Sequence, residues 1–407
     1  MENPQGSKGH WAQFDQEAAA APVLFSSESV VFEGIVPADP REKTRGEAAQ
    51  ALTGMNEVRN CPDMTNSRVE LGEIAVNFAA LRVSYAVILP PGYENGGPYP
   101  LCLVLHGGGG SRQNLIDSKP LYDKWWNAGQ IPPMVLASAS TDPLSFYFDH
   151  PDGSHRWEEF IADDFLGHLR ANYKIRSDRA STLITGASMG GYGSLKIAFG
   201  RPDRFTAVAA LEPALEPALR AADLGARNRF SFPKTGTAQE LVGDNRDPAL
   251  FESNNPATRA IANAGVIRES GLAIYLEVGD EDALNLHDGT EFLHRVLWDL
   301  DIPHEYHLVR WADHVGPSLE PRLGEAMRWL GSVLTKPPIS RSAEVSPAER
   351  AWLGWVENGF KGEAPAVDVR SEAMIRILRA QFKAAREEAA RLDPNAGRHY
   401  GVLPPTK

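Results

Sequence analysis

The stretch STLITGASMGGYG, residues 181–193, decides the fold of this chain. An apolar run rich in β-branched residues leads to Gly186, and a helix-compatible segment follows Gly193. Between them lies the pattern Gly-x-Ser-x-Gly, with Ser188 at its centre. Such a turn from strand to helix strains a serine and exposes its hydroxyl, and glycines flank it because larger side chains would collide with the neighbouring strand and helix. The stretch predicts a nucleophilic serine if the chain also supplies a base, an acid and an oxyanion site.

The composition is that of an ordinary globular protein large enough for one big domain with extensions or for two domains. The chain has 407 residues, of which 43% are hydrophobic and 23% charged. Its net charge of −12 argues against nucleic acid and anionic membrane surfaces, which favour basic patches. We find no apolar run of roughly 18 residues and no signal-peptide pattern. Cys61 and Cys102 form neither a disulfide framework nor a metal site, so we expect a cytoplasmic setting.

From residue 67 onward, buried strands alternate with amphipathic helices. Strands are predicted at residues 68–77, 81–89, 100–106, 134–138, 181–187, 205–211, 272–278 and 305–309. Helices are predicted at residues 157–173, 194–199, 288–300 and 319–334. We expect the first two strands to be antiparallel neighbours. The alternation of the others predicts an α/β fold, a mostly parallel sheet with helices on both faces.

The alternation of strands and helices is confined to the middle of the sequence, which divides the chain into three parts. We predict a catalytic domain at residues 67–335, interrupted by an insertion or lid at 212–270 that is rich in proline, alanine and charge. Residues 1–66 form an N-terminal extension with one candidate strand at 29–36. Residues 336–407 form a C-terminal helical extension with helices at 347–360 and 371–392.

The second of these C-terminal helices carries an apolar stripe, which comprises Met374, Leu378, Phe382, Ala385 and Ala389. The stripe is a candidate seam for a homodimer. Packing of such a stripe on its own domain is the commoner outcome.

A base and an acid for Ser188 follow two later strands. An acyl-transfer serine needs a histidine to take its proton and a carboxylate to orient that histidine. In a parallel α/β sheet these groups lie in loops at the carboxyl ends of strands. The strand at 272–278 is followed by Gly-Asp-Glu-Asp, and the strand at 305–309 by a loop that contains His314. The order serine, acid, histidine is typical of the α/β-hydrolase fold and differs from the chymotrypsin and subtilisin orders.

Three carboxylates in the Gly-Asp-Glu-Asp turn compete for the role of acid. We favour Asp282, because its distance from the strand end leaves room for the carboxylate to turn toward the histidine. Asp280 ranks second and Glu281 third. Asp313 adjoins His314 in sequence and would point away from the imidazole, so we expect it to be a turn residue.

The oxyanion of a tetrahedral intermediate needs two hydrogen-bond donors. The backbone amide of Met189, at the start of the helix, is one candidate. The other lies in the loop His-Gly-Gly-Gly-Gly at residues 106–110, where we favour Gly108 and rank Gly107 next. No Gly-Lys-Ser/Thr follows, which excludes a phosphate-binding loop. We expect His106 to brace this loop.

The remaining histidines predict neither a metal site nor a cofactor, because their spacing fits no ligand pattern. Aromatic residues cluster near the predicted strand ends. Trp125, Tyr147 and Trp157 are our candidates for the wall of a substrate pocket, and we expect about half of such aromatic residues to be plain core.

Five segments of the chain resemble the putative-esterase family, at residues 85–93, 105–109, 157–160, 186–193 and 201–205. That family includes esterase D (S-formylglutathione hydrolase), feruloyl and acetylxylan esterases, and the antigen 85 mycolyltransferases. The resemblance covers roughly residues 67–334 and implies a serine carboxylesterase on an α/β-hydrolase fold. It also implies that Ser188 is the nucleophile, that Asp282 matches the Gly-x-x-Asp acid and that His314 is the base. The chain departs from the family at both ends and at 212–270, so the resemblance implies no particular substrate.

These features predict a cofactor-free serine hydrolase that cleaves a small-molecule carboxylic ester through an acyl-enzyme. The same three residues also permit acyl transfer to an alcohol or sugar, or cleavage of an amide, a thioester or an activated C–C bond. A binding protein with a relict site is the alternative from a different class.

Overall fold

The computed structural model of the protein describes residues 67–78, 81–225, 248–335, 347–366 and 372–393. The candidate strand at residues 29–36 and the cysteine at position 61 lie outside the described residues. Among the described residues, no helix combines the length and the apolar character that a membrane crossing requires.

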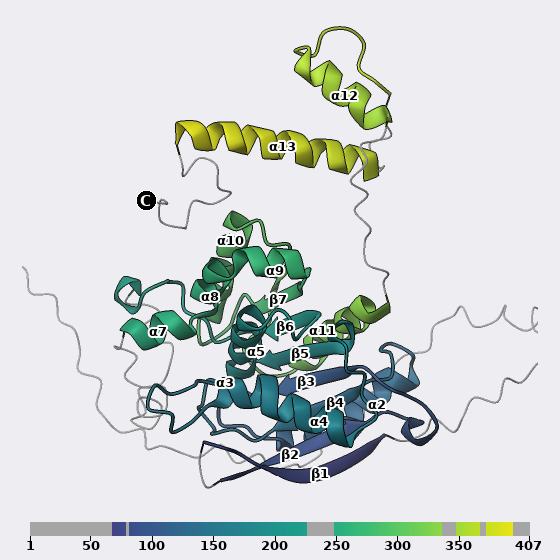
Figure 1. The fold of residues 1–407 in the computed structure, drawn as a ribbon, viewed down its shortest axis with the longest axis vertical. Coiled ribbons are helices and arrows are strands. Elements are labelled where there is room, and N and C mark those ends of the chain that lie inside the picture. Colours follow the sequence, from purple (N-terminus) through teal and green to yellow (C-terminus); the bar gives the residue numbers. More distant parts are fainter. Residues whose placement is uncertain (1–66, 79–80, 226–247, 336–346, 367–371, 394–407) are drawn as a thin grey trace, which may run out of the picture. The chain divides into compact units, whose positions relative to one another are not determined.

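An eight-stranded sheet lies at the centre of the fold, in the order β1-β2-β4-β3-β5-β6-β7-β8 (Figure 1). Its strands are β1 (Arg68–Ala75), β2 (Arg82–Leu89), β3 (Leu101–Leu105), β4 (Val135–Ala139), β5 (Thr182–Ala187), β6 (Ala207–Leu211), β7 (Ala273–Gly279) and β8 (Glu305–Val309). β2 pairs antiparallel with both β1 and β4, and every other neighbouring pair is parallel. The predicted mostly parallel sheet and the antiparallel pairing of its first two strands are confirmed.

Helices cover both faces of the sheet, as predicted, because side chains alternate along each buried strand. In β3, Leu101, Leu103 and Leu105 belong to one core cluster, and Cys102 belongs to the other. The cluster of Cys102 includes residues of α1 (Gln113–Asp117), α2 (Lys119–Asn127) and α11 (Leu319–Thr335). The other cluster includes residues of α3 (Trp157–Glu159), the π-helical turn Phe160–Phe165, α4 (Leu166–Asn172), α5 (Met189–Gly200), α8 (Pro256–Ala262), α9 (Ala264–Ser270) and α10 (Leu286–Asp299). Short 3₁₀ turns lie at Tyr93–Asn95, Arg179–Ser181 and Ala221–Asp223.

The described part of the predicted insertion belongs mainly to the core domain. After α7 (Pro248–Asn254), α8 contacts both α5 and α10, and its Ala257 and Ala260 are buried. Asn255 begins α8 by accepting a hydrogen bond from the Ala257 amide, and its side-chain amide donates to the Ala218 carbonyl at 2.7 Å. Residues 256–270 thus form the helices α8 and α9 between β6 and β7, and an insertion or lid at 212–270 stays a prediction. Residues 226–247 lie outside the described part of the chain.

The C-terminal helices α12 (Pro347–Glu357) and α13 (Glu372–Leu392) contact each other. In α13, Met374 and Ile377 are buried, whereas Ile375 and Leu378 are exposed. Of the stripe that we predicted for a homodimer, Met374 is thus already covered within the chain and Leu378 is not. Homodimer formation through this helix stays a prediction.

The junction of β5 and α5 permits no side chain at two glycines. A Cβ atom on Gly186 would lie 2.5 Å from the carbonyl carbon of Gly190. A Cβ atom on Gly190 would lie 2.2 Å from the carbonyl oxygen of Leu105 in β3. Real Cβ contacts are never this short, so α5 reaches its position over the sheet only because both residues are glycine.

We predict that Gly190→Ala lowers the free energy of unfolding by about 3 kcal/mol, because the backbone of β3 cannot move aside without loss of sheet pairing. Gly167→Ala is the matched control. A Cβ on Gly167, in α4, meets nothing within 4 Å, so this variant should gain about 0.5–1 kcal/mol of helix propensity. Urea unfolding of both variants measures the difference, and equal stabilities would refute the packing argument.

Candidate active site

Ser188 lies between β5 and α5 in a backbone conformation that side chains rarely adopt. Its φ and ψ angles are 57° and −121°. Its amide donates to the Leu211 carbonyl at 3.0 Å, and its carbonyl accepts from the amides of Tyr192 and Ala214, each at 3.0 Å. Strained backbone of this kind persists only where surrounding contacts hold it, and it concentrates at functional sites.

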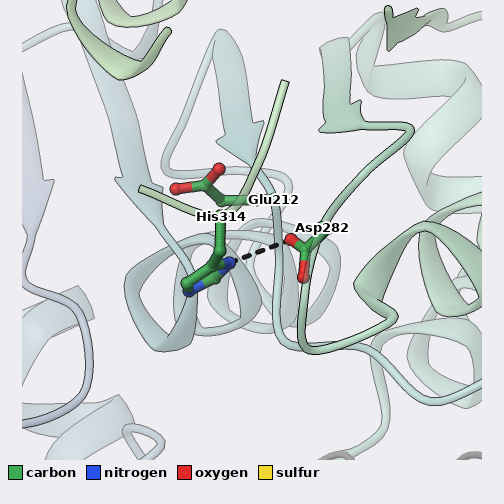
Figure 2. A group of neighbouring side chains, drawn as sticks. All are labelled: Glu212, Asp282 and His314. Atoms are coloured by element: carbon green, nitrogen blue, oxygen red, sulfur yellow. Dashed lines mark hydrogen bonds and ion pairs between the residues drawn. The ribbon is translucent and has the colours of Figure 1, made fainter. Parts of the chain in front are cut away.

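The imidazole of His314 joins Ser188 to Asp282. Its Nε2 lies 3.0 Å from Ser188 Oγ, and its Nδ1 lies 2.9 Å from Asp282 Oδ2. Figure 2 shows the ring turned toward the Asp282 carboxylate. The Asp282 side chain is 0% exposed, and its other oxygen accepts from the Leu284 amide at 2.8 Å. The structure thus brings together the three residues that sequence order predicted, from the ends of β5, β7 and β8.

The contacts of this ring also fix which of its nitrogens is able to accept a proton from Ser188. A carboxylate only accepts hydrogen bonds, so Nδ1 of His314 donates to Asp282 and Nε2 is left to accept from the Ser188 hydroxyl. Burial by itself lowers the pKa of His314. The hydrogen bond to Asp282 and the negative charges of Glu212 and Asp282 outweigh burial and raise the pKa above its ordinary value.

Asp280 and Asp313, the other candidate carboxylates, accept hydrogen bonds from backbone amides and do not contact the imidazole. Asp280 Oδ1 accepts from the Trp311 amide at 2.7 Å, which ties the turn after β7 to the loop after β8. Asp313 Oδ1 accepts from the amides of Ala283 and His314, and these bonds lower the pKa of Asp313. Glu281 is exposed.

The glycine loop after β3 leaves free amides beside Ser188. Gly109 donates to the Pro143 carbonyl at 2.7 Å and Gly110 to the Gly107 carbonyl at 3.0 Å. Within the described residues, the amides of Gly108 and Met189 donate to no acceptor. A Cβ on Gly107 would lie 3.8 Å from Ser188 Cβ, so the loop passes close to the serine.

His106 braces the start of this loop. Its Nε2 accepts from the Thr141 amide at 3.2 Å, so its Nδ1 donates to the Gly107 carbonyl at 2.9 Å. Burial lowers the pKa of His106 despite that carbonyl, which keeps the ring neutral at physiological pH. Its carbonyl accepts from the Tyr147 hydroxyl at 2.9 Å.

The three predicted pocket residues are all buried. Trp125 packs edge to face on Tyr122 and lies against Gly324 of α11, in the core cluster on the other side of the sheet from α5. We therefore correct the prediction for Trp125, which fills the core. Tyr147 and Trp157 are 0% and 1% exposed and belong to the core cluster, and Tyr147 contacts the glycine loop through its bond to the His106 carbonyl.

Two aromatic side chains lie nearer to the elbow. The Phe146 amide donates to Met189 Sδ at 3.4 Å, and Tyr192 is one helical turn beyond Ser188. Their rings pack edge to face with centroids 5.5 Å apart. Both side chains are buried, at 8% and 6% exposed, and residue types alone did not single them out.

Our sequence analysis also missed a buried ionic cluster behind the imidazole. Glu212, Glu277 and Arg322 are 1%, 1% and 5% exposed. Arg322 Nη1 donates to Glu212 Oε2 at 2.7 Å and to Glu277 Oε1 at 3.0 Å. The sequence did contain a signal for this cluster, because Glu212 directly follows a buried strand. We had assigned Glu212 to the insertion.

Glu212, Asp282 and His314 could in principle hold a metal ion, since one ligand atom of each lies within 4.8 Å of the others. Their donors are already engaged. Nδ1 of His314 donates to Asp282, and Glu212 accepts from the Arg322 guanidinium. A cation beside Glu212 repels a second cation, so the arrangement fits acid–base chemistry better than metal ligation.

Comparison with known proteins now identifies the family. Residues 81–312, more than half of the chain, match the family described as "Putative esterase", and the chain belongs to it. An esterase of Mycobacterium tuberculosis is 28% identical over 123 residues, 28% of this chain and 25% of that protein. An acetyl esterase of Caldicellulosiruptor saccharolyticus is 34% identical over 71 residues, 17% of this chain and 27% of that protein. The chain spans about a quarter of the length of these relatives.

Solved structures agree on the fold. A ferulic acid esterase superposes with a TM-score of 0.55 and 19% identity, over 66% of this chain and 99% of that chain. An S-formylglutathione hydrolase from Staphylococcus aureus gives a TM-score of 0.52 and 17% identity, over 65% and 99%. MPT51 from Mycobacterium tuberculosis gives 0.50 and 15%, over 66% and 100%. The fold is that of the α/β-hydrolase esterases.

We predict that Asp282→Asn lowers kcat by about a thousandfold, because the amide no longer fixes the Nδ1–H tautomer or stabilises the charged ring. Asp280→Asn is the control. Its side chain still offers an oxygen to the Trp311 amide, so kcat should fall less than about tenfold. Steady-state kinetics of both variants compare them, and the opposite ranking would assign the acid role to Asp280.

We also predict that kcat/KM falls on the acid side with a midpoint above roughly 6.5, the ordinary pKa of histidine. The base must be neutral to accept a proton, and a raised pKa keeps His314 protonated and inactive up to higher pH. A pH–rate profile with a neutral ester measures this midpoint. A value below 6 would contradict the assignment of His314.

Proposed function

We propose that the protein is a serine carboxylesterase that acts through an acyl-enzyme at Ser188. One observation carries the proposal: a single imidazole, that of His314, lies within hydrogen-bonding distance of both the Ser188 hydroxyl and the Asp282 carboxylate. Membership of an esterase family supports the choice of an ester as substrate.

In the first step, Ser188 Oγ attacks the ester carbonyl carbon while its proton moves to Nε2 of His314. Asp282 stabilises the imidazolium that forms, because its carboxylate faces Nδ1 at 2.9 Å. The carbonyl oxygen becomes an oxyanion, and the free amides of Gly108 and Met189 are its donors. Each such donor contributes several kcal/mol to the transition state, on the order of 3.

In the second step the C–O bond of the ester breaks. The imidazolium returns its proton to the leaving alkoxide, which departs as an alcohol and leaves the acyl group on Ser188. Water then attacks the acyl carbon with His314 again as base, and the acid is released. Both half-reactions use the same three side chains and the same two amides.

The two carboxylates near the imidazole favour a neutral acyl or alcohol group. The negative charges of Glu212 and Asp282 disfavour an anion near the serine. A neutral, small-molecule ester is therefore the proposed substrate class. Acyl transfer to an added alcohol and a cytoplasmic location stay predictions that product analysis and localisation would test.

We predict that Ser188→Ala abolishes hydrolysis of p-nitrophenyl esters, with a loss of at least about a thousandfold, while leaving the fold intact. A fluorophosphonate probe should label the wild-type protein and not this variant. Circular dichroism and thermal unfolding serve as the control for folding. Activity within tenfold of wild type, or equal labelling, would exclude Ser188 as the nucleophile.

A further inference from the structure

Glu212 lies close to Asp282 and His314, but no step of the proposed mechanism requires it. It directly follows β6, has a φ of 38°, and is held by its amide, which donates to the Glu277 carbonyl at 2.6 Å. One of its carboxylate oxygens lies within 4.8 Å of a carboxylate oxygen of Asp282 and of a ring nitrogen of His314. Figure 2 shows the side chains of Glu212, Asp282 and His314 as one group of neighbours. Two carboxylates, one after β6 and one after the neighbouring strand β7, therefore lie close to His314.

Arg322 of α11 anchors Glu212 and the histidine loop together. Its Nη1 bonds Glu212 and Glu277, and its Nη2 donates to the Asp313 carbonyl at 2.7 Å. That carbonyl belongs to the peptide bond that precedes His314. The guanidinium thus fixes the backbone of the base and the second carboxylate at once.

The cluster carries more negative than positive charge. One guanidinium, Arg322, faces the two carboxylates Glu212 and Glu277, and Asp282, which contacts His314, adds a third carboxylate. Burial raises the pKa of Glu212 to about 7 even though Arg322 and His314 lower it. Burying a second carboxylate against one guanidinium costs more desolvation than a simple ion pair, so its presence calls for a compensating role.

We propose that Glu212 is a positioning residue for His314, a second carboxylate that Arg322 holds in place to stabilise the imidazolium form of the base. This inference rests on the proposed function. When Ser188 loses its proton to Nε2, the ring becomes positive while Asp282 and Glu212 both lie near it. An ionised Glu212 at this distance favours the protonated ring by an amount on the order of one pKa unit in a partly screened site, and the positive ring in turn lowers the pKa of Glu212 and favours its ionised form.

The alternative is a purely structural role, in which Glu212 only compensates the charge of the buried Arg322. Glu277 of β7 provides the matched comparison, because it accepts from the same Nη1 and is equally buried. Glu212→Gln and Glu277→Gln each remove one carboxylate from Arg322 and leave it one carboxylate partner. Glu277, however, is not in the group formed by Glu212, Asp282 and His314. A structural role predicts equal effects of the two variants, and a positioning role does not.

The test is an NMR titration of His314 in the whole chain, with ¹³C-labelled histidine and with His314→Gln used to assign the signal. We expect Glu212→Gln to lower the pKa of His314 by roughly one unit and Glu277→Gln to lower it by less than half as much. The acid limb of kcat/KM should move to lower pH by the same amounts. The plateau kcat should fall about tenfold for Glu212→Gln, because the imidazolium loses support.

Equal shifts in the two variants, or none in Glu212→Gln, would overturn the inference. If Glu212→Gln does not fold, Glu212→Asp replaces it: this variant keeps the charge but draws it back by one methylene, and it should shift the pKa downward by about half as much. An unchanged pKa there would also overturn the inference. The titration needs no turnover, so its outcome is separate from that of Ser188→Ala, which tests the proposed function.

Discussion

The close approach of α5 to the sheet is the constraint on which the site depends. Gly190 lies against the Leu105 carbonyl and Gly186 against Gly190, with no room for a Cβ at either position. The chain must therefore turn sharply between β5 and α5, and Ser188 takes the positive φ that this turn demands. The strain is held by hydrogen bonds to Leu211 at the end of β6 and to Ala214 in the loop that follows. The position of the half-buried Ser188 hydroxyl is therefore a consequence of backbone packing.

The parallel sheet then assembles the remaining groups. Since β5, β6, β7 and β8 are neighbours and run in the same direction, their carboxyl ends meet at one edge. That edge carries Ser188, Glu212, Asp282 and His314, one after each of the four strands. The loops are short enough that each side chain needs little conformational freedom to reach its partner. Arg322, from α11, ties the loops after β6 and β8 together from behind.

Sequence reasoning reached the sheet and the three side chains that meet at its edge, Ser188, Asp282 and His314, because strand ends and residue order constrain them strongly. The acid could be ranked but not fixed: only the fold shows that Asp280 turns to the Trp311 amide while Asp282 reaches the imidazole. Glu212 was missed because a carboxylate at the start of an irregular segment is indistinguishable from a surface residue. Trp125 was misplaced because an aromatic residue near a strand end fits a core and a pocket equally well. Which face of the sheet it joins depends on how α2 and α11 pack, which local pattern does not encode.

The central claim is that an acyl group is transferred to Ser188, and trapping the intermediate tests it most directly. The wild-type protein would be mixed with a p-nitrophenyl ester, quenched in acid within the first turnovers and digested for mass spectrometry. The account predicts an increase by the mass of one acyl group on the peptide that contains Ser188 and on no other peptide. An acyl group on a different residue, or product release with Ser188 unmodified at every quench time, would contradict it.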